Sequence, residues 1–179
     1  MIKKAGLVLL VLAVMITFIS CGGTDDSEIL NALGELAPRV YEMYGIVYGD
    51  AVPHGEIEDD GYAKVTEDFP YRSIAEIKSA LSEVFTEAYC NVIYNTAFNG
   101  VSTDEGSLNA KFGEDETGLY VAPAATDGFA AAREFDLTDA KVIKKNRFAA
   151  VVQIPHADGD VYVTLILDDG VWKIDSPMF

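Results

Sequence analysis

The acidic segment between residues 56 and 67 comes nearest to the residue types and spacing of a metal site. Carboxylates stand at its first, third, fifth and twelfth positions, and Gly61 stands at the sixth. That is the spacing of a calcium-binding loop, in which carboxylate oxygens surround the ion and glycine allows a sharp turn. However, Glu56 is longer than the aspartate that opens such loops, and Pro53 and Pro70 oppose the flanking helices. We therefore predict no metal site but a solvated acidic loop, whose candidate partner-binding residues are Glu56, Glu58, Asp59 and Asp60.

Nucleophilic or acid–base catalysis needs a side chain activated by a neighbour, and the sequence offers few such pairs. His54 and His156 both fall in segments predicted to be loops, and no Gly-x-Ser-x-Gly motif is present. Cys90 has no base near it in the sequence, so we expect a buried, inert thiol. Carboxylates are abundant, but acid–base work requires a pocket that raises a carboxyl pKa. We therefore predict no catalytic residues, no cofactor and a protein that is not an enzyme.

The first 21 residues have the order of features found in export signals. Two lysines are followed by an almost unbroken apolar run over residues 6–19, and Ser20 directly precedes Cys21. This segment resembles a bacterial lipoprotein signal peptide, although Phe18 stands where that family usually has leucine. The resemblance implies cleavage after residue 20 and attachment of fatty acyl groups such as palmitate at Cys21. The alternatives are an ordinary secretory peptide and a retained membrane anchor, for which the apolar run is short.

The expected domain organisation follows from this segment: a signal peptide over 1–20, a lipidated tether over 21–26 and a single domain over 27–179. Two of the 13 basic residues lie in the signal, so the exported part has 11 against 29 acidic residues, a net charge of −18. Such a negative field repels phosphate groups, which argues against nucleic acid as a partner. It also repels anionic membrane surfaces, so membrane attachment is expected through the lipid on Cys21.

Two helical patterns precede the strands. Apolar residues at intervals of three or four between 29 and 47 predict a helix capped by Asp26 or Ser27. Pro38 interrupts this pattern, so we expect a kink near Ala37 or two short helices. A capping box begins the second helix, in which Ser73 accepts from the amide of Glu76 and the Glu76 side chain returns to Ser73. Its apolar stripe extends to residue 88, whereas residues 49–61 are predicted to form a loop.

The pattern changes to alternation in the second half of the chain. Short strands are expected near 110–112 and over 119–122, 134–137 and 141–144, with the rest of 95–118 irregular. Longer strands are expected over 147–154, 161–167 and 171–174, with a tight hairpin at Asp168-Asp169-Gly170. Trp172 and Ile174 share one sheet face and are expected to pack on the second helix as core. Helices followed by antiparallel strands predict an α+β fold, with N-terminal helices packed on a curved antiparallel sheet.

Two family resemblances arise from these elements. Residues 141–152, 161–165 and 169–175 resemble the C-terminal half of the cystatin-like or NTF2-like superfamily, which implies that curved-sheet fold but little about function. Residues 69–74 and 81–89, followed by polar sequence and the same strand ending, are similar to IseA-type inhibitors of cell-wall DL-endopeptidases. This second resemblance implies a domain that binds a peptidoglycan hydrolase and blocks its cleft.

The sequence therefore predicts a membrane-anchored, extracytoplasmic lipoprotein whose non-enzymatic domain binds a partner in the cell envelope. The IseA resemblance implies that this partner is a cell-wall DL-endopeptidase. One alternative is a cup that binds a small ligand, peptide or glycan, because aromatic residues at the open end of such a fold can line a groove. Another is an NTF2-like envelope enzyme, which requires a deep pocket with titratable groups of shifted pKa.

Overall fold

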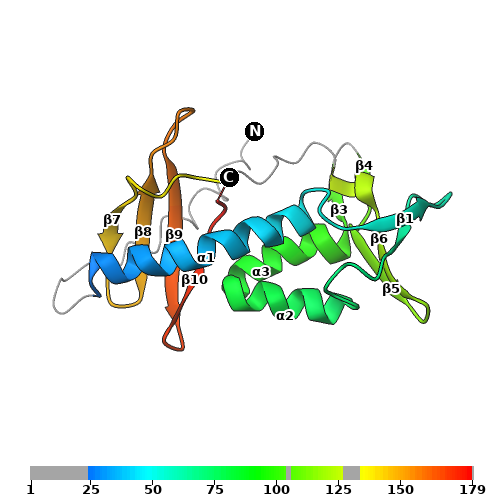
Figure 1. The fold of residues 1–179 in the computed structure, drawn as a ribbon, viewed down its shortest axis with the longest axis horizontal. Coiled ribbons are helices and arrows are strands. Elements are labelled where there is room, and N and C mark those ends of the chain that lie inside the picture. Colours follow the sequence, from blue (N-terminus) through cyan, green and yellow to red (C-terminus); the bar gives the residue numbers. More distant parts are fainter. Residues whose placement is uncertain (1–23, 104–105, 127–133, 179) are drawn as a thin grey trace, which may run out of the picture.

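The computed structural model describes residues 24–103, 106–126 and 134–178 of the chain. In Figure 1 two antiparallel sheets lie at opposite ends of the molecule, and a layer of helices connects them. The longest helix, α1 (Asp26–Val47), crosses the C-terminal sheet and extends toward the N-terminal one. The predicted α+β fold with helices packed against an antiparallel sheet is confirmed, although the sequence pattern indicates one sheet rather than two.

Helix α1 is continuous through Pro38, so the prediction of two short helices is wrong. Pro38 and Gly34 are both exposed, so the carbonyl that loses its donor to proline can be hydrated. The helix begins at Asp26, so neither predicted cap, Asp26 or Ser27, is the N-cap. The N-cap is Asp25, whose carboxylate accepts a hydrogen bond from the Ser27 amide at 3.2 Å. Its buried face carries the expected apolar residues, including Ile29, Leu33, Leu36, Val40, Tyr44 and Val47.

The predicted second helix is two helices, α2 (Ile74–Val84) and α3 (Glu87–Tyr94). The Ser73 cap is confirmed, since its hydroxyl accepts from the Glu76 amide at 3.1 Å. The return bond differs from the expected one, because the Glu76 carboxylate accepts from the Arg72 amide at 2.6 Å. Phe85 is extended and bridges to Ile174, which ends α2 before the predicted residue 88. A π-helical turn, η1 (Asn95–Asn99), follows α3.

The N-terminal sheet consists of four short strands in the order β1-β2-β6-β5. They are β1 (His54–Ile57), β2 (Ala63–Val65), β5 (Phe112–Asp115) and β6 (Gly118–Val121). Strand β1 lies within the segment predicted to be a loop, and the strand expected near 110–112 begins at Phe112. Strands β3 (Val101–Thr103) and β4 (Gly106–Leu108) form a separate hairpin that precedes β5 in the chain. A 3-10 turn, η2 (Pro123–Thr126), follows β6.

The C-terminal sheet is a meander in the order β10-β9-β8-β7. Its strands are β7 (Lys141–Lys145), β8 (Ala149–Ile154), β9 (Val161–Asp168) and β10 (Val171–Ile174). The predicted tight hairpin is confirmed, with positive φ angles at Asp169 (49°) and Gly170 (83°). The strand expected over 134–137 is absent from those residues, which have no regular structure although Phe135 is buried.

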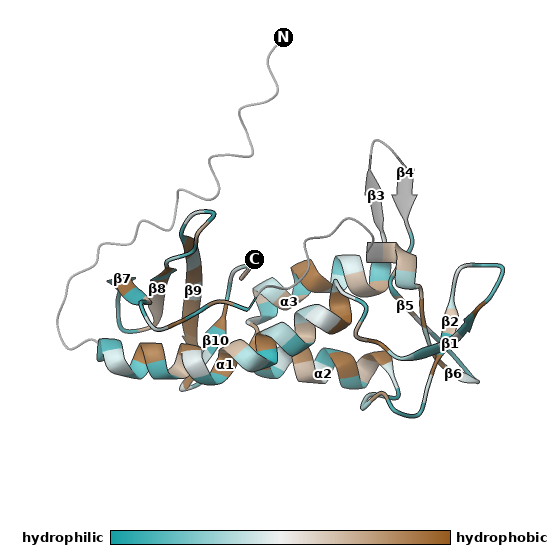
Figure 2. Cartoon of the chain, turned by 45° about the horizontal axis from the view of Figure 1, so that its top comes forward, coloured by the Kyte–Doolittle hydropathy of each residue, from teal (hydrophilic) through white to brown (hydrophobic). Residues whose placement is uncertain are grey.

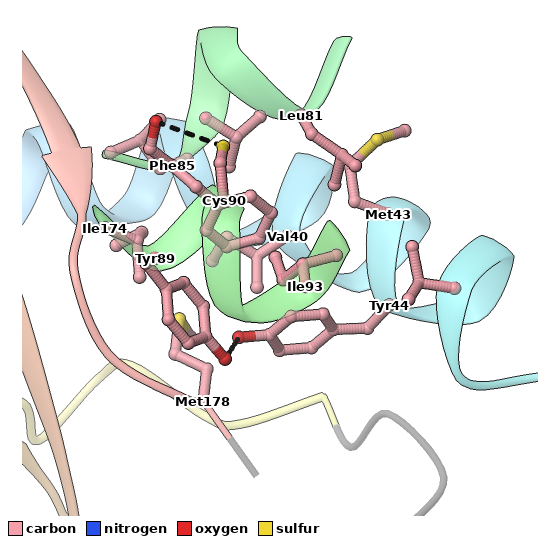
Figure 3. Packing of buried hydrophobic residues seen from close by; sticks show 14 of the residues in the cluster. Val40, Met43, Tyr44, Leu81, Phe85, Tyr89, Cys90, Ile93, Ile174 and Met178 are labelled. Carbon is pink, nitrogen blue, oxygen red and sulfur yellow. Dashed lines mark hydrogen bonds between the residues drawn. The ribbon is translucent and has the colours of Figure 1, made fainter. Parts of the chain in front are cut away.

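One hydrophobic cluster connects the helices to both sheets. Helix α1 contacts β7 and β10, the edge strands of the C-terminal sheet, and α2 contacts β10. Trp172 and Ile174 are buried in this cluster, as predicted for a shared sheet face. Figure 3 shows its centre, where the Tyr44 and Tyr89 hydroxyls face each other at 2.9 Å. The core is therefore continuous from one end of the described chain to the other.

Candidate functional site

The N-terminal sheet carries a surface hollow of about 290 Å³ that brings acidic residues from two hairpins together. We call it the acidic hollow. The β1–β2 connection contributes Glu58 and Asp60, two of the predicted partner-binding residues, and the turn-proximal end of β5 contributes Glu114 and Asp115. Two tyrosines also line the hollow. The full lining is Glu58, Asp60, Tyr62, Gly113, Glu114, Asp115 and Tyr120.

Local hydrogen bonds fold the β1–β2 connection into a tight hairpin. The Glu58 amide donates to the Tyr62 carbonyl at 2.7 Å, and the Gly61 amide donates to the Glu58 carbonyl at 2.9 Å. The Asp60 carboxylate accepts from the Tyr62 amide at 3.0 Å, and Gly61 has a φ of 87°. These bonds make a strand–turn–strand unit where a calcium loop would need flanking helices. As predicted, the acidic segment 56–61 is exposed, and Figure 2 colours the connection hydrophilic.

A second turn, between β5 and β6, holds the Asp115 carboxylate. The Thr117 hydroxyl and the Thr117 amide both donate to Asp115 Oδ1, each at 2.7 Å. These hydrogen bonds, the side-chain one first, hold the pKa of Asp115 below its ordinary value. The Thr117 hydroxyl also contacts the Tyr120 hydroxyl, which links the turn to the ring on β6. Asp115 is therefore a fixed anion and a poor proton donor at neutral pH.

Tyr62 supplies a neutral aromatic ring beside these anions. Its hydroxyl donates to the Ala110 carbonyl at 2.7 Å. Burial raises the pKa of Tyr62, and the negative charge of Asp60 raises it further. The ring lies against Gly113, where an added Cβ would approach the Tyr62 ring at 3.6 Å. Carboxylates flanking a neutral phenol ring form an environment that suits an ammonium or guanidinium group, through charge and cation–π attraction together.

The remaining predicted residues, Glu56 and Asp59, line a neighbouring hollow of about 860 Å³ on the same hairpin. Glu58 and Asp60 belong to both hollows, and Lys64 on β2 also lines the larger one. The structure thus places all four predicted acids on one hairpin but brings only two of them into the acidic hollow. In Figure 1 this hairpin projects from the end of the molecule.

Sequence reasoning missed Glu114, Asp115 and Tyr62. The sequence pattern predicts a mostly irregular segment over 95–118, but residues 112–121 contain a signal for a hairpin. Apolar Phe112 and Leu119 flank the polar turn 115–118, which is the pattern of a short hairpin. The proximity of this hairpin to β1–β2 depends on the pairing of β2 with β6, where Lys64 lies opposite Tyr120. That pairing joins segments far apart in the sequence.

The two histidines do not line the acidic hollow. His54 Nδ1 lies 2.8 Å from the Gly55 carbonyl on the exposed β1 strand, and His156 stacks edge-on against Phe135 near the other sheet. No histidine or cysteine is among the residues lining the hollow. Within residues 24–103, 106–126 and 134–178, no group of three or more His, Cys, Asp or Glu side chains is arranged to hold a metal ion.

Cys90 is buried in the core, as predicted. Burial raises the pKa of its thiol, and Sγ lies 3.8 Å from the Phe85 carbonyl (Figure 3). Cys21 and the predicted signal peptide lie outside the described residues. Among the helices that the structure describes, none is long and apolar enough to span a bilayer.

Comparison of the chain with protein-family models, with curated proteins and with solved structures finds no match. The lipoprotein, NTF2-like and IseA-type resemblances stay predictions from the sequence.

Proposed function

We propose that this protein is a lipid-anchored, extracytoplasmic lipoprotein whose non-enzymatic domain binds a basic segment of an envelope protein in the acidic hollow. The observation that carries this proposal is that one hollow is lined by four acidic residues and two tyrosines: Glu58, Asp60, Glu114, Asp115, Tyr62 and Tyr120. An arginine or lysine side chain of a partner satisfies both features of this lining, because its charge meets the carboxylates and its stem or guanidinium plane lies on a ring.

The size and composition of the hollow support a protein side chain as the occupant. Its volume of about 290 Å³ lies just below the ~300–1,000 Å³ typical of small-molecule pockets. Such pockets are lined mostly by apolar side chains, whereas four of the seven residues here are acidic. The anionic state of Asp115 favours attraction of a cation over proton donation to a substrate. These properties support the binding of a basic side chain.

We further propose that the partner is a cell-wall DL-endopeptidase, which the protein restrains. The IseA-type resemblance suggests this partner, and the shape of the N-terminal end supports it. The β1–β2 hairpin projects from the molecule and all four residues of β1 are exposed. A projecting hairpin next to a cation-binding hollow is suited to enter an enzyme cleft while the hollow holds a basic side chain at its rim. The partner would then be inhibited by obstruction.

Membrane attachment through Cys21 is the remaining part of the proposal, and it has its own test. The chain contains two cysteines, of which Cys90 is buried. A thioether-linked lipid on Cys21 leaves Cys90 as the one thiol that reacts after denaturation. Purified membrane-extracted protein is therefore expected to show one reactive thiol per chain in denaturant, and two reactive thiols would show that Cys21 is unmodified.

Photo-cross-linking in the intact envelope tests the partner directly. A photoreactive phenylalanine analogue replaces Tyr120 in the hollow, and a matched chain carries it at exposed Glu35 on α1. We expect an adduct with a specific envelope protein at Tyr120 that is missing at Glu35. Mass spectrometry identifies the captured protein. The purified lipoprotein is then added to that captured protein in a peptidoglycan-cleavage assay.

Dose-dependent loss of cleavage supports restraint of a wall hydrolase. Capture of a partner that is not a hydrolase would support binding in the acidic hollow but would reject the proposed inhibition of a wall hydrolase. Identical adducts at Tyr120 and Glu35 would reject the acidic hollow as the binding site.

A further inference from the structure

The C-terminal sheet carries a basic segment in a chain that is otherwise strongly acidic. Strand β7 and the turn that follows contain Lys141, Lys144, Lys145 and Arg147 within seven residues. Two large apolar side chains lie among them, Ile143 at 44% exposure and Phe148 at 58%. We call residues 141–148 the basic strip. Basic residues interleaved with exposed apolar ones are the composition of protein surfaces that rest in a membrane interface.

The basic strip lies beside the point where the described chain leads toward Cys21. Lys145 Nζ donates to the Thr24 carbonyl at 2.8 Å and lies 2.6 Å from Asp26 Oδ1. Thr24 is three residues from Cys21, and three residues span at most about 11 Å. A lipid on Cys21 therefore enters the bilayer close to the strip, whatever path the intervening residues take.

Among the described residues, three of the four basic residues of the strip have no carboxylate partner, whereas several carboxylates near the strip are engaged. Lys141, Lys144 and Arg147 form no ion pair with a carboxylate in the part of the chain that the structure describes, and the Arg147 guanidinium lies 5.1 Å from the centre of the Phe148 ring. On the carboxylate side, Asp25 caps α1 and Asp26 pairs with Lys145. In the adjoining β9–β10 hairpin, Asp168 pairs with Lys173 at 3.0 Å.

Strands β1, β2, β5 and β6, whose residues and connections line the acidic hollow, lie at the opposite end of the molecule (Figure 1). Helix α1 runs between the two ends, and its 22 residues correspond to about 33 Å of helix. The Debye length at physiological ionic strength is about 8 Å. The acidic end is therefore screened from a surface that touches the strip, so the net negative charge of the whole chain does not cancel a local attraction.

We propose that the basic strip docks on the anionic headgroups of the membrane that holds the lipid. Phe148 and Ile143 enter the interface, while Lys141, Lys144 and Arg147 contact lipid phosphates. The docked domain stands with α1 leading away from the membrane and presents the acidic hollow toward the envelope. This inference rests on the proposed lipid anchor, and it adds an orientation that the anchor alone does not impose.

Tryptophan emission on vesicles tests this orientation with two matched probes. Phe148→Trp reports the strip and Ile57→Trp reports the far end, because Phe148 and Ile57 have nearly equal exposures of 58% and 57%. Buried Trp172 is the single native tryptophan and gives a constant background. Each full lipidated chain is reconstituted on vesicles of phosphatidylcholine alone or with phosphatidylglycerol, and quenching by brominated lipid is measured. We expect blue-shifted, quenched emission from Phe148→Trp on phosphatidylglycerol vesicles and unquenched emission from Ile57→Trp.

A charge-matched pair of triple variants completes the test in the Phe148→Trp background. Lys141→Gln/Lys144→Gln/Arg147→Gln is expected to abolish the quenching, because each basic residue near an anionic surface strengthens attachment about fivefold. Arg39→Gln/Lys64→Gln/Lys78→Gln removes the same charge elsewhere and is expected to leave the quenching intact.

Three results would overturn the proposal. Phe148→Trp could show no quenching on phosphatidylglycerol vesicles, or Ile57→Trp could be quenched equally. The two triple variants could also change the quenching equally. Sedimentation with phosphatidylcholine vesicles reports the lipid anchor separately. A chain that does not sediment there lacks the anchor, while its emission on phosphatidylglycerol vesicles still decides the role of the strip.

Discussion

The Glu114 carboxylate on β5 accepts a hydrogen bond from the Ile74 amide, at 2.9 Å, in the first turn of α2. This contact fastens one wall of the acidic hollow to the helical layer. It also places a negative charge at a helix N-terminus, where unpaired amides and the helix dipole favour it. Glu114 therefore has a structural role in addition to its place in the hollow.

Replacing this carboxylate is expected to weaken the fold slightly. Glu114→Gln should lower the free energy of unfolding by about 0.5–1 kcal/mol, because the helix N-terminus loses a charged partner. Glu116→Gln, in the exposed turn beside it, is the matched control and should change the unfolding free energy by less than about 0.5 kcal/mol. Urea denaturation measures the free energy of unfolding of the unsubstituted protein and of the two variants. Equal losses in the two variants would argue against a stabilising role of the Glu114–Ile74 contact.

The ionisation of Asp115 should depend on Thr117. Thr117→Val removes the hydroxyl donor but keeps the amide donor, so the pKa of Asp115 should rise part of the way toward its ordinary value. Thr138→Val is the control, because Thr138 makes the equivalent hydrogen bonds to Asp136. This substitution should raise only the pKa of Asp136. Carboxyl NMR titration measures both groups. An unchanged Asp115 titration in Thr117→Val would contradict the role given to that hydroxyl.

Two glycines near and in α1 should respond to alanine in opposite directions. A Cβ added at Gly34 meets nothing within 4 Å, so Gly34→Ala should stabilise the protein by about 0.5–1 kcal/mol through helix propensity. A Cβ added at Gly49 would lie 2.9 Å from the Gly45 carbonyl oxygen, which is backbone and cannot move aside. Gly49→Ala should therefore destabilise the protein, and thermal unfolding gives both signs.

Stability should fall in alkaline solution because buried tyrosines resist ionisation. Burial raises the pKa values of Tyr44 and Tyr48, and it raises the pKa of Tyr94 to about 12. In the unfolded chain these groups titrate near pH 10. The folded state then holds more protons above pH 10, so stability is complete below that pH and declines as pH rises, by up to about 1.4 kcal/mol per pH unit per group.

Urea unfolding at a series of pH values from about 8 to about 11 measures this slope. Tyr44→Phe should make the slope shallower than that of the unsubstituted protein. A slope insensitive to Tyr44→Phe would show that the buried hydroxyl is not the source.

Local signals predicted some elements well. The Ser73 cap places the start of α2, and Asp169-Gly170 places the β9–β10 turn, because each depends on bonds or φ angles within a few residues. The same stripe of apolar residues that predicts α2 also runs past its end. Phe85 leaves the helix because it bridges to Ile174, at the other end of the chain, and no local pattern reports that contact.

The acidic hollow was half predictable for the same reason. Glu58 and Asp60 stand in a conspicuous run of acids, whereas Glu114 and Asp115 join them only through the β2–β6 pairing. Strands β1 and β2 are four and three residues long, and β1 is exposed throughout, so neither gives the alternation that identifies a half-buried strand. The part of the acidic hollow that the sequence pattern did not predict therefore depends on long-range pairing between short strands.

The central claim is that a basic partner binds in the acidic hollow, and the Tyr120 cross-link measures it most directly in two charge-matched chains. Glu58→Gln/Asp60→Asn removes two charges from the hollow, and Glu35→Gln/Asp139→Asn removes two from exposed sites on α1 and near β7. We predict an adduct yield at least about tenfold lower for the first pair, since two charge-assisted contacts are lost, and an unchanged yield for the second. Equal yields from both chains would contradict the account.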